Sequence, residues 1–270
     1  MGLTSYRAAL LREVAIKFIE TIYNFQASVC YNKYLMAHLK KYLVDTGCVD
    51  QNKKLRLSNL FLMFQESAEE HSEILGIGHD KTTFAGRKWV ITRYSLKINR
   101  MPKFEENINV YTYPGKPNPF FLYRHFYVTD ENGNLLVVAS SIWTILDAKT
   151  NKIVSNPFDV NIPGESKDFE LELPKKINDD AFNKVKEHQI EYSDIDLNGH
   201  VNNIKYIELI QNIHDTEFYK NNEIDTFVIN YFSEIKEKEN VSLFVNKGET
   251  EVIKGSVDNR DCFKAIITYK

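Results

Sequence analysis

The sequence contains one order of predicted elements twice, and this repeat constrains the fold more than any other feature. Each copy reads as a short strand, a polar turn, an amphipathic helix and four further strands. The first helix is expected to have Ser58 as its N-cap and to end before Gly76, and the second is expected to span residues 202–218. Two copies of about 110 residues each indicate a duplicated domain.

The predicted strands alternate apolar and polar residues, as Tyr94, Leu96 and Ile98 show. They cover residues 42–44, 89–99, 108–113, 120–129 and 135–147 in the first copy, and 185–191, 227–234, 241–246, 252–257 and 263–269 in the second. A long helix lying across an antiparallel sheet buries one face of each element, which predicts the α+β class. Two such sheets side by side give each helix more apolar cover than one copy provides.

The predicted division of the chain has four parts. They are an N-terminal helical extension (1–40), a first domain (41–150), a linker (151–182) and a second domain (183–270). The extension carries apolar residues at spacings of three and four, namely Leu11, Val14, Ala15, Phe18, Ile19, Ile22 and Phe25. We expect this helix to pack on its own domain, and the alternative is contact with a membrane or a partner.

Composition excludes several classes of protein. The formal net charge is -3 over 270 residues, so there is no basic excess that would indicate a nucleic-acid binder. Cys30, Cys48 and Cys262 are scattered, which argues against a disulfide scaffold or a zinc site and favours the reducing cytoplasm. His71 and His79 have no ligands at metal spacing and are predicted to be surface residues. We expect no metal, no cofactor, no membrane span and no signal peptide.

The turn at residues 194–203 concentrates chemistry. It places Asp196, Asn198 and His200 just before a helix, where unsatisfied backbone N–H groups suit a developing oxyanion. An imidazole there can act as general acid or base near neutral pH. The plainer interpretation is an ordinary turn and helix cap. The first copy keeps Asp50 and Asn52 but has Lys54 in place of His200, which indicates that only one half is active.

Several segments together carry a family resemblance. Residues 196–206 resemble the signature D-x-N-x-H-V-N-N-x-K-Y, and residues 64–68 match on the first helix. Trp89 to Arg93 and Ser141 to Asp147 resemble the motifs W-x-x-x-R and S-x-W-x-x-x-D. With these segments the chain resembles the acyl-ACP thioesterases, which include the plant FatA and FatB enzymes and bacterial relatives. The resemblance runs from about Lys41 to Lys270, nearly the whole chain.

The resemblance implies a tandem double hotdog fold, with each hotdog a long helix across an antiparallel sheet. It implies that the N-terminal hotdog holds the acyl chain and that the C-terminal hotdog carries catalysis. Asp196, Asn198 and His200 match the family's catalytic Asp, Asn and His. Glu234 matches a catalytic glutamate in an I-x-Y-x-x-E motif that begins here at Ile229.

One position departs from the plant enzymes, which often have Cys directly after that glutamate, whereas this chain has Ile235. Cys262 is distant in sequence, and nothing near it indicates a lowered thiol pKa. We therefore expect water, activated by Glu234 or His200, to attack the thioester. Asn198 and helix amides would polarise the carbonyl and Asp196 would position its neighbours, while the choice of base stays open.

The expected function is hydrolysis of fatty acyl-ACP to free fatty acid and acyl carrier protein, ending chain elongation. The alternatives are an acyl-CoA thioesterase of the same superfamily and a non-catalytic acyl-binding protein. The expected partner is acyl carrier protein with a phosphopantetheine-linked acyl chain, and both a monomer and a homodimer are compatible with the sequence. Candidate tunnel residues are Phe61, Met63, Phe64, Phe120, Phe121 and Tyr123, and candidate basic docking clusters are 40–41, 53–56 and 175–176.

Overall fold

The computed structural model describes residues 37–115, 118–155, 182–196, 199–248 and 250–270. The helix predicted in the extension therefore lies outside the described residues, as do most of the predicted linker and Asn198. The predicted four-part division of the chain stays a prediction. Strand β1 (His38–Leu43) begins four residues before the predicted strand, because His38 to Leu43 pair with β3.

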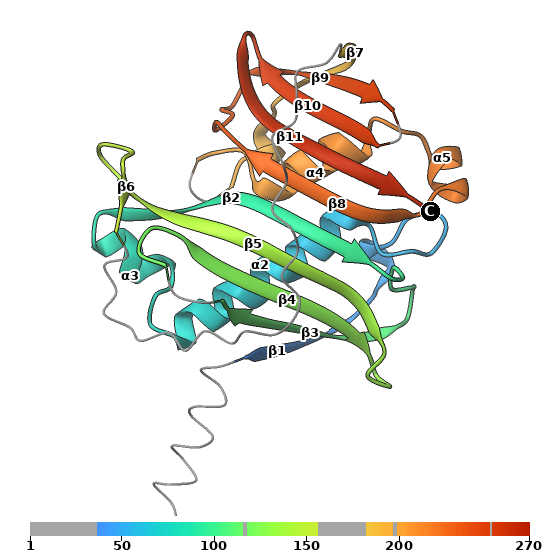
Figure 1. Cartoon of the computed structure of the whole chain (residues 1–270), viewed down its shortest axis with the longest axis horizontal. Coiled ribbons are helices and arrows are strands. Elements are labelled where there is room, and N and C mark those ends of the chain that lie inside the picture. The colour runs from blue at the N-terminus through green and yellow to red at the C-terminus, as the bar shows by residue number, and fades with distance from the viewer. Residues whose placement is uncertain (1–36, 116–117, 156–181, 197–198, 249) are drawn as a thin grey trace, which may run out of the picture.

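The described residues form one 11-stranded sheet in which every strand pair is antiparallel. The order is β1-β3-β4-β5-β2-β8-β11-β10-β9-β7, with β6 paired to β5 (Figure 1). The strands after β1 are β2 (Arg87–Ile98), β3 (Asn107–Pro114), β4 (Leu122–Asp130), β5 (Leu135–Asp147), β6 (Ile153–Val154), β7 (Asn183–Gln189), β8 (Ile224–Tyr231), β9 (Asn240–Lys247), β10 (Glu251–Val257) and β11 (Arg260–Tyr269). The predicted α+β class and the repeated strand order are confirmed.

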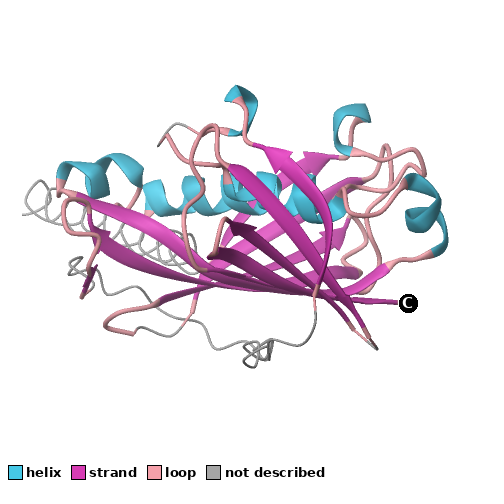
Figure 2. Ribbon diagram, turned by 90° about the horizontal axis from the view of Figure 1, so that it is seen from above, coloured by secondary structure: helices cyan, strands magenta, loops and turns pink. Residues whose placement is uncertain are grey.

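The helices lie on one face of this curved sheet (Figure 2). They are α2 (Leu57–Ile74), α3 (His79–Phe84), α4 (Asn203–Gln211) and α5 (Thr216–Asn221), with short 3-10 helices at Thr46–Cys48 and Tyr192–Asp194. In α2, buried residues recur at Leu57, Leu60, Phe61, Phe64 and Ala68. This spacing puts them on the helix face that meets the sheet.

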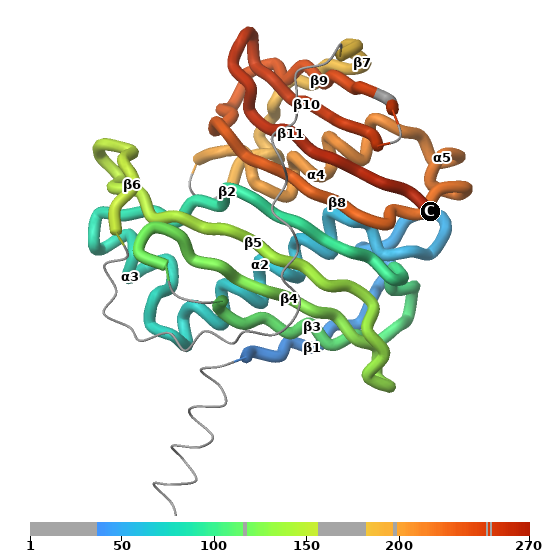
Figure 3. The backbone as a smooth tube through the Cα atoms, viewed as in Figure 1, coloured from blue at the N-terminus to red at the C-terminus, as the bar shows by residue number. Residues whose placement is uncertain are grey.

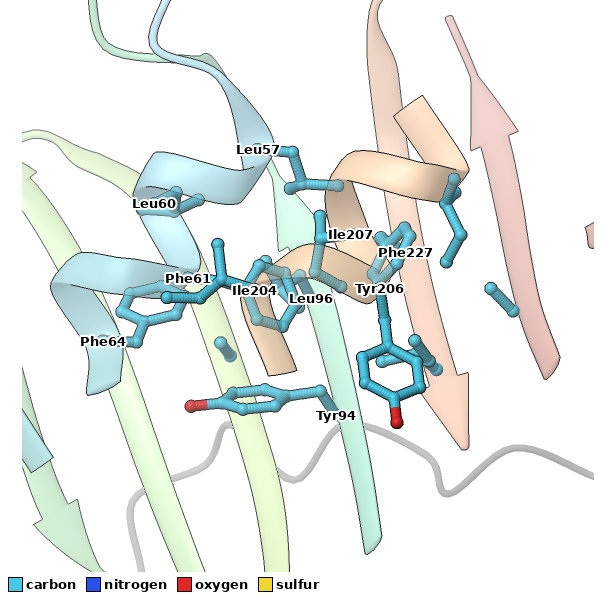
Figure 4. Close-up of a cluster of buried hydrophobic side chains, with 14 of the residues drawn as sticks. Leu57, Leu60, Phe61, Phe64, Tyr94, Leu96, Ile204, Tyr206, Ile207 and Phe227 are labelled. Atoms are coloured by element: carbon cyan, nitrogen blue, oxygen red, sulfur yellow. The ribbon is translucent and has the colours of Figure 1, made fainter. Parts of the chain in front are cut away.

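The two halves join where β2 pairs with β8, from Arg93 opposite Asn230 to Lys97 opposite Thr226 (Figure 3). We call this pairing the seam. Across it, the rings of Phe61 and Phe227 lie 5.7 Å apart, and within the first half the rings of Phe61 and Tyr94 lie 4.8 Å apart. Figure 4 shows side chains of α2, α4, β2 and β8 meeting in a single cluster. The two predicted sheets are therefore one sheet with one core.

The predicted N-cap of α2 is wrong. Ser58 lies inside the helix, and Arg56 occupies the cap position without a side-chain cap. The Ser58 backbone N–H instead donates to the Gln211 Oε1 atom, 3.0 Å away, at the end of α4. A side chain from the other half of the chain thus does the capping that Ser58 was expected to do.

The helix predicted over residues 202–218 is also interrupted. Helix α4 ends at Gln211, and α5 begins after Asp215, whose side chain accepts a hydrogen bond of 2.9 Å from the Phe218 N–H. Asp is a strong N-cap residue, so a new helix starts where the apolar period alone predicted continuation. Helix α3 was not predicted from the sequence.

His71 contradicts the prediction of a surface position, because its side chain is fully buried. It follows Phe64 and Ala68 at helical spacing on the buried face of α2. Its Nδ1 atom lies 3.1 Å from the guanidinium of Arg124, a buried residue of β4 whose pKa burial lowers to about 10. His79 is exposed, as predicted.

Candidate active site

The turn before α4 is held by its own backbone. The Asp196 N–H donates to the His200 carbonyl (2.8 Å), the Gly199 N–H donates to the Asp196 carbonyl (3.0 Å), and the His200 N–H donates to the Asp196 side chain (3.3 Å). Gly199 has φ +76°, a left-handed conformation that glycine adopts without strain. Asp196 therefore fixes the turn that presents His200. Asn198 lies outside the described residues.

The first half contains the same turn with other side chains. Asp50 receives hydrogen bonds from the N–H groups of Asn52 (2.8 Å) and Lys54 (3.0 Å), as Asp196 does from His200. The Leu55 N–H donates to the Pro102 carbonyl (2.8 Å), just as the Val201 N–H donates to the Ile235 carbonyl (3.2 Å).

These matching bonds identify two equivalent corners of the molecule. His200 corresponds to Lys54, and Glu234, which precedes Ile235, corresponds to Met101, which precedes Pro102. Only the second corner therefore carries an imidazole and a carboxylate.

His200 and Glu234 come together from different elements. His200 lies in the turn before α4, and Glu234 lies in the loop after β8. The His200 Nε2 atom is 3.2 Å from the Glu234 Oε2 atom, and the two side chains are 33% and 42% exposed. The structure thus brings together the two residues between which the choice of base was left open, at a place that water reaches.

Lys88 is a third member of this cluster that the sequence did not reveal. It lies on β2 in the first half, and its ammonium is 2.9 Å from the Glu234 Oε1 atom. Trp89 was part of a recognisable motif, but a lone lysine before it carries no signal. Only the register of the seam, which the sequence does not reveal, brings this lysine to Glu234. Arg93 lies opposite Asn230 in this antiparallel pairing. If the pairing is continued for five more residues, residue 88 comes opposite residue 235.

The backbone around Glu234 is held by neighbouring side chains. The Arg260 guanidinium donates to the Glu234 carbonyl and also pairs with Glu239 at 2.9 Å. The Ile235 N–H donates to the Tyr206 hydroxyl of α4 at 3.2 Å, and burial raises the pKa of Tyr206. Glu234 is therefore presented by an anchored loop.

Cys262 is not arranged as a nucleophile. Its side chain is fully buried, and burial raises the pKa of its thiol, which disfavours the thiolate. Its Sγ atom lies 3.4 Å from the Arg260 carbonyl. The plant cysteine position holds Ile235, which is fully buried. Neither position supports a cysteine acyl-enzyme.

A small pocket has room for about one water molecule, and neither His200 nor Glu234 lines it. Asn203, three residues after His200, and Tyr231, three residues before Glu234, both line it. The Tyr231 hydroxyl is buried and has no hydrogen-bond partner among the described residues. The full lining is Phe61, Gln65, Ile91, Tyr94, Trp143, Asn203, Ile204 and Tyr231, so both halves contribute. Of the other predicted tunnel residues, Met63 and Phe64 belong to the core, whereas Phe120 and Phe121 are 51% and 37% exposed.

The described ranges contain neither a metal-binding cluster nor a membrane-spanning helix. No group of three or more His, Cys, Asp or Glu residues there is arranged to hold a metal ion. None of the helices in those ranges has both the length and the apolar character needed to cross a membrane.

Comparison with known proteins decides the family. Residues 36–161 match the acyl-ACP thioesterase N-terminal domain, and residues 177–262 match the acyl-ACP thioesterase C-terminal domain. The chain belongs to the acyl-ACP thioesterase family. The two matches fall on the two halves that the seam joins, and the C-terminal match includes His200 and Glu234.

Solved structures and curated relatives agree with this membership. An acyl-ACP thioesterase from Bacteroides thetaiotaomicron superposes with a TM-score of 0.83 and 23% identity, covering 89% of this chain and 99% of that one. The 12:0-ACP thioesterase from Umbellularia californica gives 0.77 and 18%, covering 87% and 97%. These likenesses show the double hotdog fold.

A palmitoyl-acyl carrier protein thioesterase from Cuphea hookeriana is 27% identical over 62% of this chain and 44% of its own length. The chain thus spans about half the length of the curated relatives it matches.

Proposed function

We propose that this protein hydrolyses the thioester of fatty acyl-ACP and releases a free fatty acid, so ending chain elongation. The observation that carries the proposal is the 3.2 Å pairing of His200 with Glu234 at one of two otherwise equivalent corners. Family membership gives the class of substrate, and the curated relative from Cuphea hookeriana is named for palmitoyl-ACP. The non-catalytic alternative leaves this pair without a role.

In this proposal His200 is the general base and Glu234 orients it. Both Glu234 oxygens already have a partner, Lys88 on one and His200 on the other. A carboxylate that accepts from the His200 Nε2–H leaves Nδ1 as the basic nitrogen of the ring. Nδ1 takes a proton from water as the water attacks the thioester carbonyl, and the same ring then protonates the leaving thiolate.

The remaining groups handle the carbonyl and the acyl chain. Asn198 and the N-terminal amides of α4 are proposed to polarise the carbonyl oxygen, while Asp196 positions the turn. The acyl chain is proposed to lie against the core that the two halves share, where Phe61 and Ile204 provide apolar walls. No cofactor takes part in this chemistry.

Acyl carrier protein is the proposed partner, but the predicted docking clusters are partly neutralised. Lys40 lies 3.5 Å from Glu66 and 3.4 Å from Glu70, and Lys54 pairs with Glu223 at 2.5 Å. The cluster at residues 175–176 lies outside the described residues.

A cytoplasmic location remains part of the proposal, supported by the free thiols of Cys48 and Cys262.

The test measures fatty acid release from a panel of acyl-ACPs and acyl-CoAs of different chain length. We expect wild type to hydrolyse acyl-ACP with a higher kcat/KM than acyl-CoA. His200→Ala should lower kcat at least about 100-fold, because it removes the general base. Glu234→Gln should retain more activity than His200→Ala, because the amide oxygen can still accept a hydrogen bond from the ring and so keeps part of the orienting effect. His188→Ala is the matched control, since His188 also lies 3.2 Å from a carboxylate, that of Asp194, in the same half.

Each outcome has a meaning. A folded wild type that turns over neither donor contradicts the enzyme, and bound lipid without turnover points to an acyl-binding protein. A preference for acyl-CoA contradicts the assigned carrier but not the chemistry. Full activity in His200→Ala contradicts the assigned site. A loss in Glu234→Gln equal to that in His200→Ala removes the distinction between base and orienting group.

A further inference from the structure

The carboxylate that faces His200 is shared with a cation from the other half of the chain. Lys88 reaches the Glu234 Oε1 atom at 2.9 Å, while His200 lies 3.2 Å from Oε2. Lys88 is held on β2 opposite Leu146 of β5, so its position depends on the first half's sheet. The catalytic half thus receives one member of its polar cluster from the half that carries no catalytic pair.

The other charged and titratable groups around Glu234 have different tasks. Arg260 binds the Glu234 carbonyl and is neutralised by Glu239. The Tyr206 hydroxyl accepts from the following N–H. Asp196 binds the His200 backbone. Cys262 is buried, and its carbonyl accepts from the Phe232 N–H at 2.8 Å. Apart from His200, Lys88 is the only residue among those described that has an ion pair with the Glu234 carboxylate.

We propose that Lys88 is a positioning residue for the proposed hydrolysis: its ammonium holds the Glu234 carboxylate directed at His200. The inference rests on the proposed function. A carboxylate bonded at both oxygens has little freedom to rotate, so the ring it orients is held for proton transfer.

The seam provides a matched control at its opposite end. Lys97 of β2 pairs with Asp225 of β8 at 2.6 Å, so it too joins a lysine and a carboxylate across the two halves. Asp225 does not face His200, and Lys97 has no place in the proposed mechanism. Lys88→Met and Lys97→Met each remove one cross-half ion pair and keep a similar unbranched stem.

The kinetic test compares these variants on the best acyl donor of the panel. We expect Lys88→Met to lower kcat on the order of tenfold with KM within about twofold, because orientation rather than binding is lost. Lys88→Arg should restore most of kcat, and Lys97→Met should match wild type. Lys88→Gln repeats the comparison if Lys88→Met folds poorly.

A second readout is independent of turnover. The ring nitrogen signals of His200, identified by their absence in His200→Ala, are recorded by NMR at the pH of the assay and report which ring nitrogen carries the proton. In wild type the proton should lie on Nε2, which faces Glu234, and Lys97→Met should give the same pattern. In Lys88→Met the preference for Nε2 should weaken, because the carboxylate is no longer held toward the ring. This measurement judges Lys88 even if no acyl donor is turned over, so failure of the proposed function and failure of this inference are distinguishable.

Three results would overturn the proposal. One is a Lys88→Met enzyme with the kcat of Lys97→Met. Another is a raised KM at unchanged kcat, which would mean that Lys88 binds the substrate instead. The third is a His200 ring whose preference for the Nε2 proton is the same in Lys88→Met as in wild type.

Discussion

At the scale of single residues, two neighbouring tyrosines show how a buried hydroxyl depends on its partner. Tyr206 and Tyr231 pack edge to face with ring centroids 5.4 Å apart. The Tyr206 hydroxyl accepts from the Ile235 N–H, whereas the Tyr231 hydroxyl has no partner among the described residues. Leaving a buried polar group unpaired is unfavourable by about 1–3 kcal/mol.

The two tyrosines should therefore respond oppositely to loss of the hydroxyl. Tyr231→Phe is expected to raise the free energy of unfolding by about 1 kcal/mol, because an unpaired group is removed. Tyr206→Phe is expected to lower it by about 1 kcal/mol, because the Ile235 N–H loses its acceptor. Urea denaturation of both variants measures the difference. Equal effects of the same sign would contradict this account.

Residues of the candidate site could be predicted from the sequence only where they belong to a dense polar segment or to a motif. The segment from Asp196 to His200 is dense in polar groups, and Glu234 was found through a motif. Lys88 carries no pattern, because its meaning arises from strand pairing with the other half. His71 was placed wrongly because a histidine was assumed to be exposed, although its spacing from Phe64 fits the buried face.

At the scale of elements, contacts between the halves decide where helices begin and end. The N-terminal turn of α2 is capped by Gln211, which lies 153 residues further along the chain. No local pattern predicts such a cap, and Ser58 was the reasonable local choice. The strands were predicted more closely, because alternation and the turn at Asp130 to Gly133 are local signals.

Because Gln211 of α4 caps α2, a substitution of Gln211 should lower the stability of the fold. Gln211→Ala should lower the free energy of unfolding by about 1 kcal/mol, the usual loss when a cap is removed. Gln189→Ala, at the exposed end of β7, should change it by less than about 0.5 kcal/mol. Chemical denaturation of the two variants makes the comparison. Indistinguishable midpoints would mean that water replaces the Gln211 side chain at the Ser58 N–H.

The connection between β2 and β3 predicts an acid-sensitive element. Two Arg100 nitrogens bond to Glu106 at 2.9 and 2.7 Å, and the Lys103 N–H donates to the same carboxylate at 2.8 Å. The Arg100 hydrogen bonds hold the pKa of Glu106 below its ordinary value of 4.5. Because the folded value is the lower one, this stabilisation is present above pH 4.5 and is lost as pH falls through the folded value.

Glu106→Gln should therefore flatten the loss of stability below that pH. Glu105→Gln, at the exposed neighbouring position, should leave the pH dependence as in wild type. Thermal melts between pH 3 and 6, a range chosen to span ordinary carboxyl titration, measure both. The inference is wrong if Glu106→Gln loses stability on acidification as steeply as wild type does.

At the scale of the whole molecule, the seam joins the two halves in one sheet and one core, and we expect them to unfold as a single cooperative unit. Residues of both halves share one core, and Phe227 at its centre is fully buried. Duplication was predictable because the order of elements repeats, and the double hotdog was implied by the family resemblance. A single continuous core was not, because alternation along β2 and β8 does not say which strand each will pair with.

Cooperative unfolding can be checked with two probes that report on different regions. Both tryptophans, Trp89 and Trp143, lie in the first half, while far-ultraviolet circular dichroism reports on the whole chain. The two transitions should coincide in wild type. In Phe227→Ala they should shift together, with a loss of about 3–5 kcal/mol. A circular dichroism transition in two steps would show that the halves unfold separately.

The two equivalent corners bear on how such a molecule can evolve. In an assembly of identical chains every substitution appears at each symmetric position, so a residue useful at one corner is imposed on the other. Joining the copies in one polypeptide removes that constraint. Here one corner holds His200 and Glu234, while the other holds Lys54, which is ion-paired with Glu223, and Met101. In a single chain the residues of the two corners are encoded separately, so selection can change one corner while the other stays the same.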